Sequence, residues 1–115
     1  MRASSRAAFI LVVALAVVGC GGGAATTPSA VATTTVDLPK SYRFEPPAIT
    51  VDSGATVTWT NHDEFTHNVT FDGEAALVMK PGESVTRVFG DAGTFAYMCL
   101  LHPTEMRGSV VVGGS

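Results

Sequence analysis

The sequence predicts an all-β domain, a Greek-key β-sandwich of seven or eight antiparallel strands. Apolar and polar residues alternate with a period of two over several short segments between residues 48 and 112, which is the pattern of half-buried strands. No helical periodicity competes with this alternation over a comparable length. Clusters of glycine, proline and aspartate separate the segments, as turns separate the strands of a sandwich.

Six segments carry the alternation, and each is typical of one strand. In "ATVTWTN", Val57 and Trp59 share one face while Thr56 and Thr58 share the other, so Trp59 is expected at the centre of the core. The segment "EAALVM" (74–79) fits either a strand or a loop. The predicted strands are "AITV" (48–51), "ATVTWTN" (55–61), "HNVTFDG" (67–73), "ESVTRVF" (83–89), "TFAYMC" (94–99) and "GSVVV" (108–112), with turn signals at 52–54, 72–73, 80–82 and 91–93.

Residues 1–19 are typical of a secretory signal peptide. Arg2 and Arg6 precede the apolar run "AAFILVVALAVVG", which is shorter than the about 20 residues that a membrane span needs. The run ends in "VVGC", which resembles a bacterial lipobox and implies cleavage before Cys20 and lipidation of that residue. An ordinary signal peptide cleaved a few residues later, near "GGGAA", is the alternative. Lipidation predicts an exported protein anchored at the cell envelope, on the periplasmic or outer face of the membrane.

Residues 20–36 are expected to form a flexible tether after the lipidated cysteine, and residues 37–115 one small domain. The segment "GGGAATTPSAVATTTV" has no aromatic residue and no charge, so it cannot bury enough surface to fold. Without the two arginines of the signal, five basic residues face ten acidic ones, a formal charge of −5. This acidic balance, with no basic patch, excludes nucleic acid as a partner.

Metal-binding residue types concentrate in "TFAYMCLLHPTEMRGSVVV" (94–112). If Cys20 is lipidated, Cys99 is the remaining thiol and has no disulfide partner, which favours a ligand. By strand parity Cys99 and His67 both point inward from strand ends, so they can converge at one pole. The donor set is then a thiolate, two imidazoles and a thioether, from Cys99, His67, His102 and Met106. Zinc would take the first three, but a thioether suits cuprous copper, and the full set is that of a blue-copper electron-transfer site.

The chain resembles the cupredoxins, the type 1 blue copper proteins of the plastocyanin, amicyanin and halocyanin kind. The resemblance runs from "YRFEPPAITVDSGATVTWTNHDEFTHNVTF" (42–71) to "GTFAYMCLLHPTEMRGSVVV" (93–112). It implies one copper ion held by His67, Cys99, His102 and Met106. It also implies that the backbone N–H of Asn68 donates to the Cys99 sulfur, which raises the reduction potential. The same resemblance implies an apolar collar around His102, through which electrons pass to a transient partner, formed by Leu100, Leu101 and Pro103.

The ligand loop departs from the family in one respect. Three residues, "PTE", separate His102 from Met106, whereas amicyanin-like loops have two there and plastocyanin-like loops have four. Loop length sets how the axial ligand approaches the metal, and Glu105 is an alternative axial donor that would lower the potential.

One-electron transfer by a monomeric, membrane-tethered copper protein, cycling between Cu(I) and Cu(II), is the leading functional hypothesis. Its partners are then transient redox proteins. The alternative is copper capture or delivery at the cell envelope. An enzyme is not expected, because a second copper centre needs further histidines and the chain has only three. A purely structural sandwich leaves Cys99 as an unexplained oxidation hazard.

Overall fold

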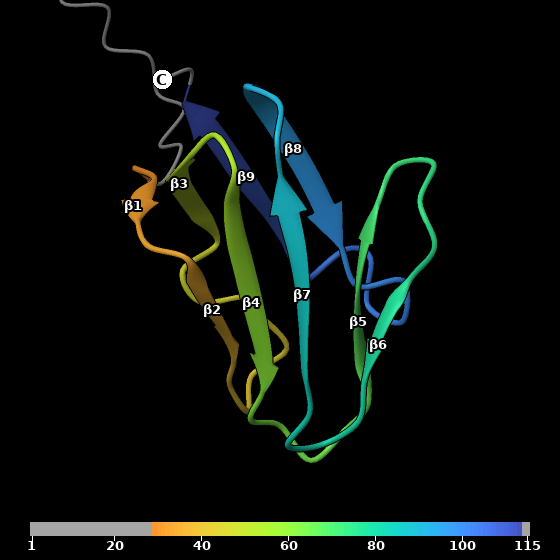
Figure 1. Ribbon diagram of the computed structural model, residues 1–115. Coiled ribbons are helices and arrows are strands. Elements are labelled where there is room, and N and C mark those ends of the chain that lie inside the picture. The colour runs from red at the N-terminus through yellow and green to blue at the C-terminus, as the bar shows by residue number, and fades with distance from the viewer. Residues whose placement is uncertain (1–28, 114–115) are drawn as a thin grey trace, which may run out of the picture.

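The computed structural model describes residues 29–113, which form two facing β-sheets (Figure 1). This part of the chain contains nine strands. No helix in it is long and apolar enough to cross a membrane. The strands are β1 (Val31–Ala32), β2 (Thr35–Leu38), β3 (Ala48–Asp52), β4 (Ala55–Asn61), β5 (His67–Phe71), β6 (Leu77–Met79), β7 (Ser84–Phe89), β8 (Gly93–Met98) and β9 (Arg107–Gly113).

The strand order confirms an all-β Greek-key sandwich, but one with mixed rather than purely antiparallel sheets. The larger sheet has the order β1-β3-β9-β8-β5-β6 and the smaller one β2-β4-β7. The pairs β1–β3, β2–β4 and β3–β9 are parallel, because the chain crosses between the sheets before it returns to a neighbouring strand. The pairs β4–β7, β5–β8 and β8–β9 are antiparallel.

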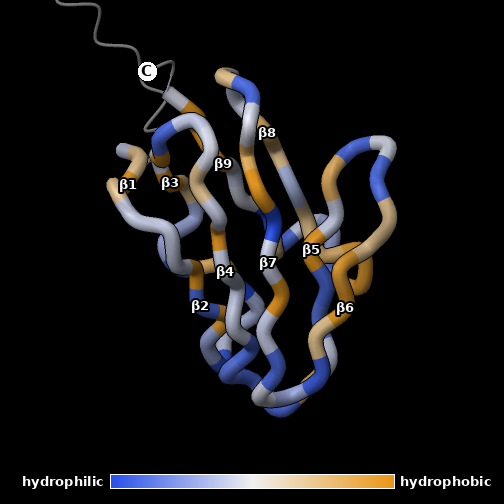
Figure 2. The backbone as a smooth tube through the Cα atoms, in the orientation of Figure 1, coloured by the Kyte–Doolittle hydropathy of each residue, from blue (hydrophilic) through white to orange (hydrophobic). Residues whose placement is uncertain are grey.

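Trp59 lies fully buried at the centre of the core, as its alternation predicts. Hydrophobic and hydrophilic residues alternate along β4 and β7 (Figure 2), so each strand presents one face to the interior. The Trp59 ring packs edge-on against Phe71 and Tyr97, with centroids 6.0 and 5.4 Å away. The Tyr97 ring also covers Gly108 on β9, where an added Cβ would overlap it. Gly108 therefore permits the close packing beside the end of β8.

The domain begins earlier than the sequence analysis expected. Strand β1 and the first two residues of β2 lie within the predicted tether of residues 20–36, and Val36 and Leu38 are fully buried. In "TVDL" these two residues alternate with polar ones, a strand pattern that the surrounding small residues conceal. The segment "EAALVM" divides, with Glu74–Ala76 in a loop and Leu77–Met79 in β6. The predicted signal peptide, Cys20 and the first part of the tether lie outside the described residues.

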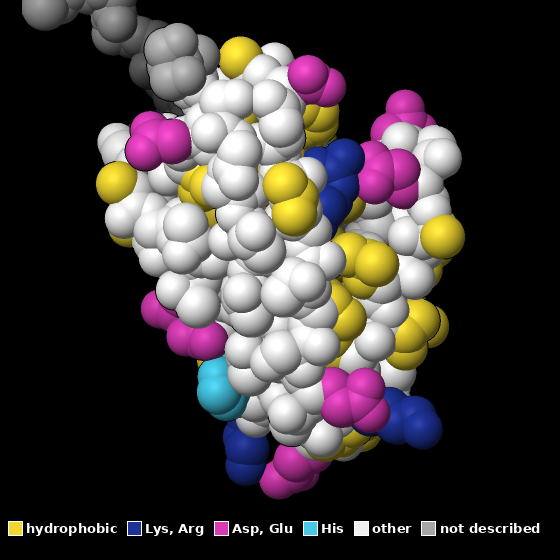
Figure 3. Space-filling model, in the orientation of Figure 1, with side chains coloured by type: hydrophobic (Ala, Val, Ile, Leu, Met, Phe, Trp, Pro, Cys, Tyr) yellow, Lys and Arg dark blue, Asp and Glu magenta, His cyan; other side chains and the backbone are white. Residues whose placement is uncertain are grey.

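The surface carries charges of both signs. On the face shown in Figure 3, Lys and Arg side chains are scattered among Asp and Glu rather than gathered into one patch. This arrangement agrees with the acidic balance of the sequence and offers no stripe for a phosphate backbone on that face.

Candidate metal centre

The sheet topology brings the four predicted ligands to one end of the sandwich. His67 is the first residue of β5, and Cys99 directly follows β8. Because β5 and β8 are antiparallel neighbours, the start of one lies beside the end of the other. Met106 directly precedes β9, which pairs with β8. The loop that contains His102 therefore connects two adjacent strands at the same pole.

Cys99 and His67 form the buried centre of this pole. Both residues are 0% exposed, and the Cys99 Sγ lies 3.9 Å from the His67 Nδ1. Two ligands about 120° apart on one metal ion, with bonds of about 2.0 Å to nitrogen and about 2.3 Å to sulfur, would be separated by about 3.7 Å. The two side chains are thus spaced and oriented as a pair of ligands to one ion.

Asp63 fixes the orientation of His67, a role that the sequence analysis missed. The His67 Nε2 lies 2.8 Å from the Asp63 Oδ2, and both side chains are buried. An Nε2–H donated to this carboxylate leaves the Nδ1 lone pair free to face Cys99, the arrangement that supports metal-binding histidines. The hydrogen bond with His67 holds the pKa of the Asp63 carboxyl below its ordinary value, against the opposing effect of burial.

A buried turn around Asn61 sets the position of Asp63. The Asn61 Oδ1 accepts from the Asp63 backbone N–H at 2.9 Å. The Asn61 side-chain amide donates to the carbonyls of Phe65 and Met79 at 2.7 and 3.1 Å. This side chain therefore ties the turn to β6. The sequence signal for this contact was the Asx-turn pattern "NHD" (61–63), which places Asp63 four residues before His67.

Asn68 connects the two ligand-bearing segments, as the family resemblance implies. Its backbone N–H donates to the Cys99 Sγ at 3.4 Å. Its side-chain Oδ1 accepts from the Leu100 backbone N–H at 2.8 Å and from the Thr70 hydroxyl at 2.9 Å. Cys99 and the residue that follows it are thereby held to β5.

The three-residue spacing between His102 and Met106 is accommodated by a helical turn. The Met106 N–H donates to the His102 carbonyl at 2.9 Å, an i to i−4 bond that places both side chains on one side of the turn. The Cys99 N–H donates to the Met106 carbonyl at 3.1 Å and closes the loop. Met106 is fully buried, whereas Glu105 is exposed. The alternative axial donor therefore faces solvent.

His102 lies at the rim of the site. It is half-buried, and its ring centroid is 5.5 Å from that of His67. An imidazole centroid lies roughly 3 Å from a metal bound to its nitrogen, so two rings on one ion can be up to about 6 Å apart. Within residues 29–113, no three His, Cys, Asp or Glu side chains form a compact group. The four-residue ligand set therefore stays a prediction.

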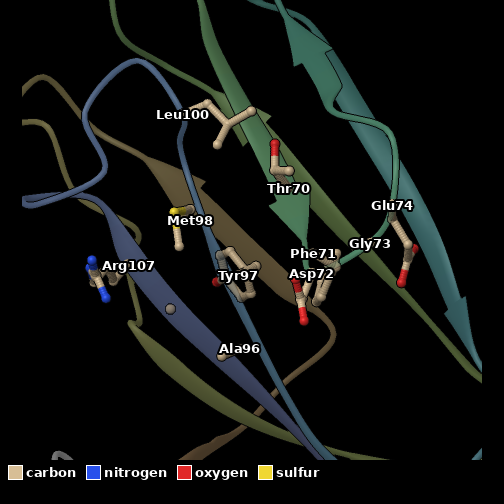
Figure 4. A pocket seen from close by; sticks show the side chains of 11 residues that line it. Thr70, Phe71, Asp72, Gly73, Glu74, Ala96, Tyr97, Met98, Leu100 and Arg107 are labelled. Carbon is tan, nitrogen blue, oxygen red and sulfur yellow. The ribbon is translucent and has the colours of Figure 1, made fainter.

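The three residues of the predicted apolar collar are exposed on the loop that carries His102. Leu100 and Leu101 are 53% and 57% exposed, and Pro103 is exposed as well. A separate groove of about 380 Å³ lies on the outer face of the larger sheet, with Thr70, Met98 and Leu100 on its walls (Figure 4). None of the four predicted ligands lines this groove, so it is not the metal site.

Comparison with known proteins identifies the class. A profile of the family described as "Copper binding proteins, plastocyanin/azurin family" matches residues 30–113. The chain is 44% identical over 84 residues to an amicyanin from Paracoccus denitrificans, and the match covers 67% of this chain and 63% of that protein, less than two thirds of its length. It is 35% identical over 83 residues to a plastocyanin from Scenedesmus fuscus, covering 60% of this chain and 85% of that one.

A solved structure agrees with these relatives. The Cu(I) form of an amicyanin mutant has a TM-score of 0.63 and 41% identity, and the match covers 75% of this chain and 87% of that chain. The fold and the family together define a small copper-binding β-sandwich protein. The chain belongs to the plastocyanin/azurin family and is a cupredoxin. This membership confirms copper as the cofactor, and the thiolate and imidazole spacing at the pole fits it.

Proposed function

We propose that this cupredoxin is a membrane-tethered, one-electron carrier with a single blue copper ion. The observation that carries the proposal is the buried Cys99–His67 pair, 3.9 Å apart, with the Asn68 amide on the sulfur. A thiolate in this environment is protected from solvent oxidation and preorganised for a metal. The amicyanin and plastocyanin relatives support the same assignment.

In this proposal His67, Cys99, His102 and Met106 hold the copper, which supplies a centre that gains and loses one electron. The burial of Met106 favours it over the exposed Glu105 as the axial ligand. Cys99 and His67 are held by the β5–β8 ladder and by Asn68. Ligands fixed in this way move little when the charge of the centre changes, and small reorganisation permits fast transfer.

Two hydrogen bonds act on the reduction potential in opposite directions. The Asn68 N–H withdraws charge from the Cys99 sulfur, which disfavours the oxidised ion and raises the potential. The Asp63 carboxylate increases the basicity of the His67 ring, which favours the oxidised ion and lowers the potential. The reduction potential therefore depends on the relative strength of these two hydrogen bonds.

Electrons are proposed to pass through the exposed edge of the site at His102. The apolar collar of Leu100, Leu101 and Pro103 suits a weak, quickly released encounter with a redox partner. Leu101→Ala is expected to slow electron exchange with a small soluble cytochrome several-fold while the visible spectrum stays unchanged. Equal exchange rates in the two proteins would contradict this role. The chain is proposed to act as a monomer and to carry no enzymatic activity, since copper oxidation chemistry needs further ligands that its three histidines do not supply.

Anchoring through a lipidated Cys20 completes the proposal. In this proposal the tether runs from Cys20 to Val31, where the first strand of the described residues begins. A flexible segment of about ten residues would have a root-mean-square reach of roughly 15–20 Å. That length holds an exported domain close to the membrane surface on the periplasmic or outer side. Mass spectrometry of the membrane fraction, comparing the chain with its Cys20→Ala variant, tests this point. A protein that stays lipid-free in both forms would contradict it.

Copper capture or delivery is the second candidate function, and the partial exposure of His102 is what favours it. The full burial of Cys99, His67 and Met106 disfavours it, because delivery requires exchangeable ligands. Transfer of copper to an apo acceptor faster than electron exchange would establish delivery instead.

The visible spectrum tests the copper site directly. The mature chain from residue 20, with Cys20→Ser so that one thiol remains, receives one equivalent of Cu(II). We expect a strong blue or green thiolate-to-copper band that Cys99→Ser abolishes. A colourless product with a disulfide-linked dimer would show that Cys99 is exposed and unligated, and the proposal would fall.

A further inference from the structure

We propose that Tyr42 is a positioning residue for the copper centre, an aromatic wall that restrains His102. This inference rests on the proposed copper site. Tyr42 lies in the loop between β2 and β3, far in sequence from all four predicted ligands. Nothing in its sequence context distinguishes it from an ordinary surface tyrosine.

The ring of Tyr42 contacts both candidate histidine ligands. Its centroid is 4.6 Å from that of His102 at an interplanar angle of 66°, and 5.9 Å from that of His67 at 89°. Both are edge-to-face arrangements, which aromatic rings prefer to parallel stacking. Phe65 stacks against Tyr42 at 6.0 Å and 21°. Tyr42 thus stands between the half-buried ligand and a second aromatic side chain.

The backbone of Tyr42 indicates that this placement is imposed. Its φ is +52°, and it is the one non-glycine residue with a positive φ among residues 29–113. A bulky aromatic residue rarely adopts the left-handed region, and it stays there only when the surroundings determine the conformation. Such conformations concentrate at functional sites.

The loop that carries Tyr42 is fixed on both sides. Phe44, two residues further on, is buried and packs edge-on against Tyr97 with centroids 4.8 Å apart. Asp37 and Glu45 exchange two backbone hydrogen bonds of 2.8 Å across the base of the loop. With Phe44 directed into the core, Tyr42 is held against the two histidine rings at the metal pole, where its side chain stays 37% exposed.

The expected consequence is a restrained outer ligand. His102 is the half-buried member of the predicted set, and its loop supplies only backbone hydrogen bonds to it. An aromatic wall limits the ring orientations that it can adopt and excludes water from that side. We therefore expect Tyr42 to slow copper loss and to restrict the orientations that the His102 ring adopts at the copper centre.

The test compares three variants in the mature chain. Tyr42→Phe keeps the ring, Tyr42→Ala removes it, and Val88→Ala removes an exposed side chain on β7 in the other sheet. Copper removal by a Cu(I) chelator is expected to be about tenfold faster in Tyr42→Ala, which converts to about 1.4 kcal/mol. It should stay within about twofold of the parent rate in the other two. Equal rates in Tyr42→Ala and Val88→Ala would overturn the proposal.

Two copper-free measurements separate this proposal from that of the copper site. Nuclear Overhauser contacts between the Tyr42 and His102 rings are expected in the apo protein, and their absence would overturn the proposal even where copper binds. Tyr42→Gly is expected to melt at a higher temperature than Tyr42→Ala, because glycine tolerates φ of +52°. The reverse order would show that the backbone at residue 42 is not constrained. A colourless parent protein would contradict the proposed function and, with it, the role of Tyr42 at the copper centre, whereas a coloured parent without the ring contacts would contradict this proposal alone.

Discussion

The two ends of β5 each hold a carboxylate against a cationic or imidazole partner, and the two pairs serve different purposes. At the start of β5, Asp63 and His67 form a buried pair with side chains 5% and 0% exposed. Beyond its end, Glu74 and Arg87 form a pair with side chains 45% and 21% exposed. The first pair fixes the direction of the His67 ring, a predicted ligand, and the second closes the edge of the sandwich.

The Arg87 pair is surrounded by aromatic rings. The Arg87 guanidinium lies 4.5 Å from the centroid of Phe71 and 4.4 Å from that of Phe89. Its Nε donates to one oxygen of Glu74 at 3.0 Å and its Nη2 donates to the other at 2.6 Å. The cation therefore joins the β5–β6 loop to β7, across the gap between the sheets. Its contribution is expected in stability, whereas that of Asp63 is expected in metal chemistry.

Removing the Arg87 side chain should give the largest effect, a loss of folding stability with no change at the metal centre. Arg87→Ala loses three cation–π contacts and one bidentate ion pair, together about 2–3 kcal/mol. For a domain of this size the melting temperature of the copper-free protein should fall by roughly 10–20 °C. The copper-loaded variant should keep its visible spectrum, since no predicted ligand contacts Arg87. Calorimetry and absorption spectra measure the two outcomes, and a changed spectrum with unchanged melting would contradict the division of roles.

Asp63 should affect the metal centre with a smaller effect on free energy. Asp63→Ala leaves the His67 ring without its carboxylate partner and is expected to weaken copper binding by about 10–100-fold, or about 1.4–2.8 kcal/mol. Asp63→Asn still offers an acceptor to Nε2 but removes the charge. That variant should retain colour and raise the reduction potential by roughly 40 mV, for about 1 kcal/mol in a one-electron couple.

The matched control for Asp63→Asn is Glu74→Gln. It removes one negative charge as well, but from the pair with Arg87. Its reduction potential should stay at the parent value, because Glu74 lies beyond the opposite end of β5 from His67. Redox titration of the three proteins settles the comparison. Equal shifts in both variants would mean that net charge, and not the contact with His67, sets the potential.

The sequence predicts the features that depend on local patterns and does not predict the contacts that depend on the folded structure. Strands between residues 48 and 112 were predictable because period-two alternation is a local property. Cys99, His102 and Met106 could be named as candidate ligands because "CLLH" and Met106 lie in one short loop, and their role as ligands stays a prediction. The contacts of Asp63 and Tyr42 depend on a buried Asx turn and on a left-handed backbone residue. The sequence around Asp63 or Tyr42 does not predict which side chain each of them contacts. Strand β2 was missed because Val36 becomes a core residue only by pairing with the distant Trp59.

Acid should produce the smallest effect and act through the two carboxylates. The hydrogen bond from Arg87 holds the pKa of Glu74 below its ordinary value, despite the opposing effect of partial burial. The unfolded chain therefore binds a proton at Glu74 at a higher pH than the folded protein does. The stability from this pair is present above the unfolded pKa of about 4.3 and is lost as the pH falls through the folded pKa.

Urea unfolding of the copper-free protein between pH 6 and pH 3 measures this loss. The parent should lose stability more steeply with falling pH than Glu74→Gln, which has no proton to bind at that site. The difference should correspond to less than one proton, because the pair is partly exposed and solvent screens it. The hydrogen bond with His67 also lowers the pKa of Asp63. The pH dependence of stability that remains in Glu74→Gln therefore includes the contribution of Asp63. A slope identical to that of the parent would mean that Arg87 holds the sandwich edge through its aromatic contacts alone, and that the carboxylate at this end of β5 contributes nothing to stability.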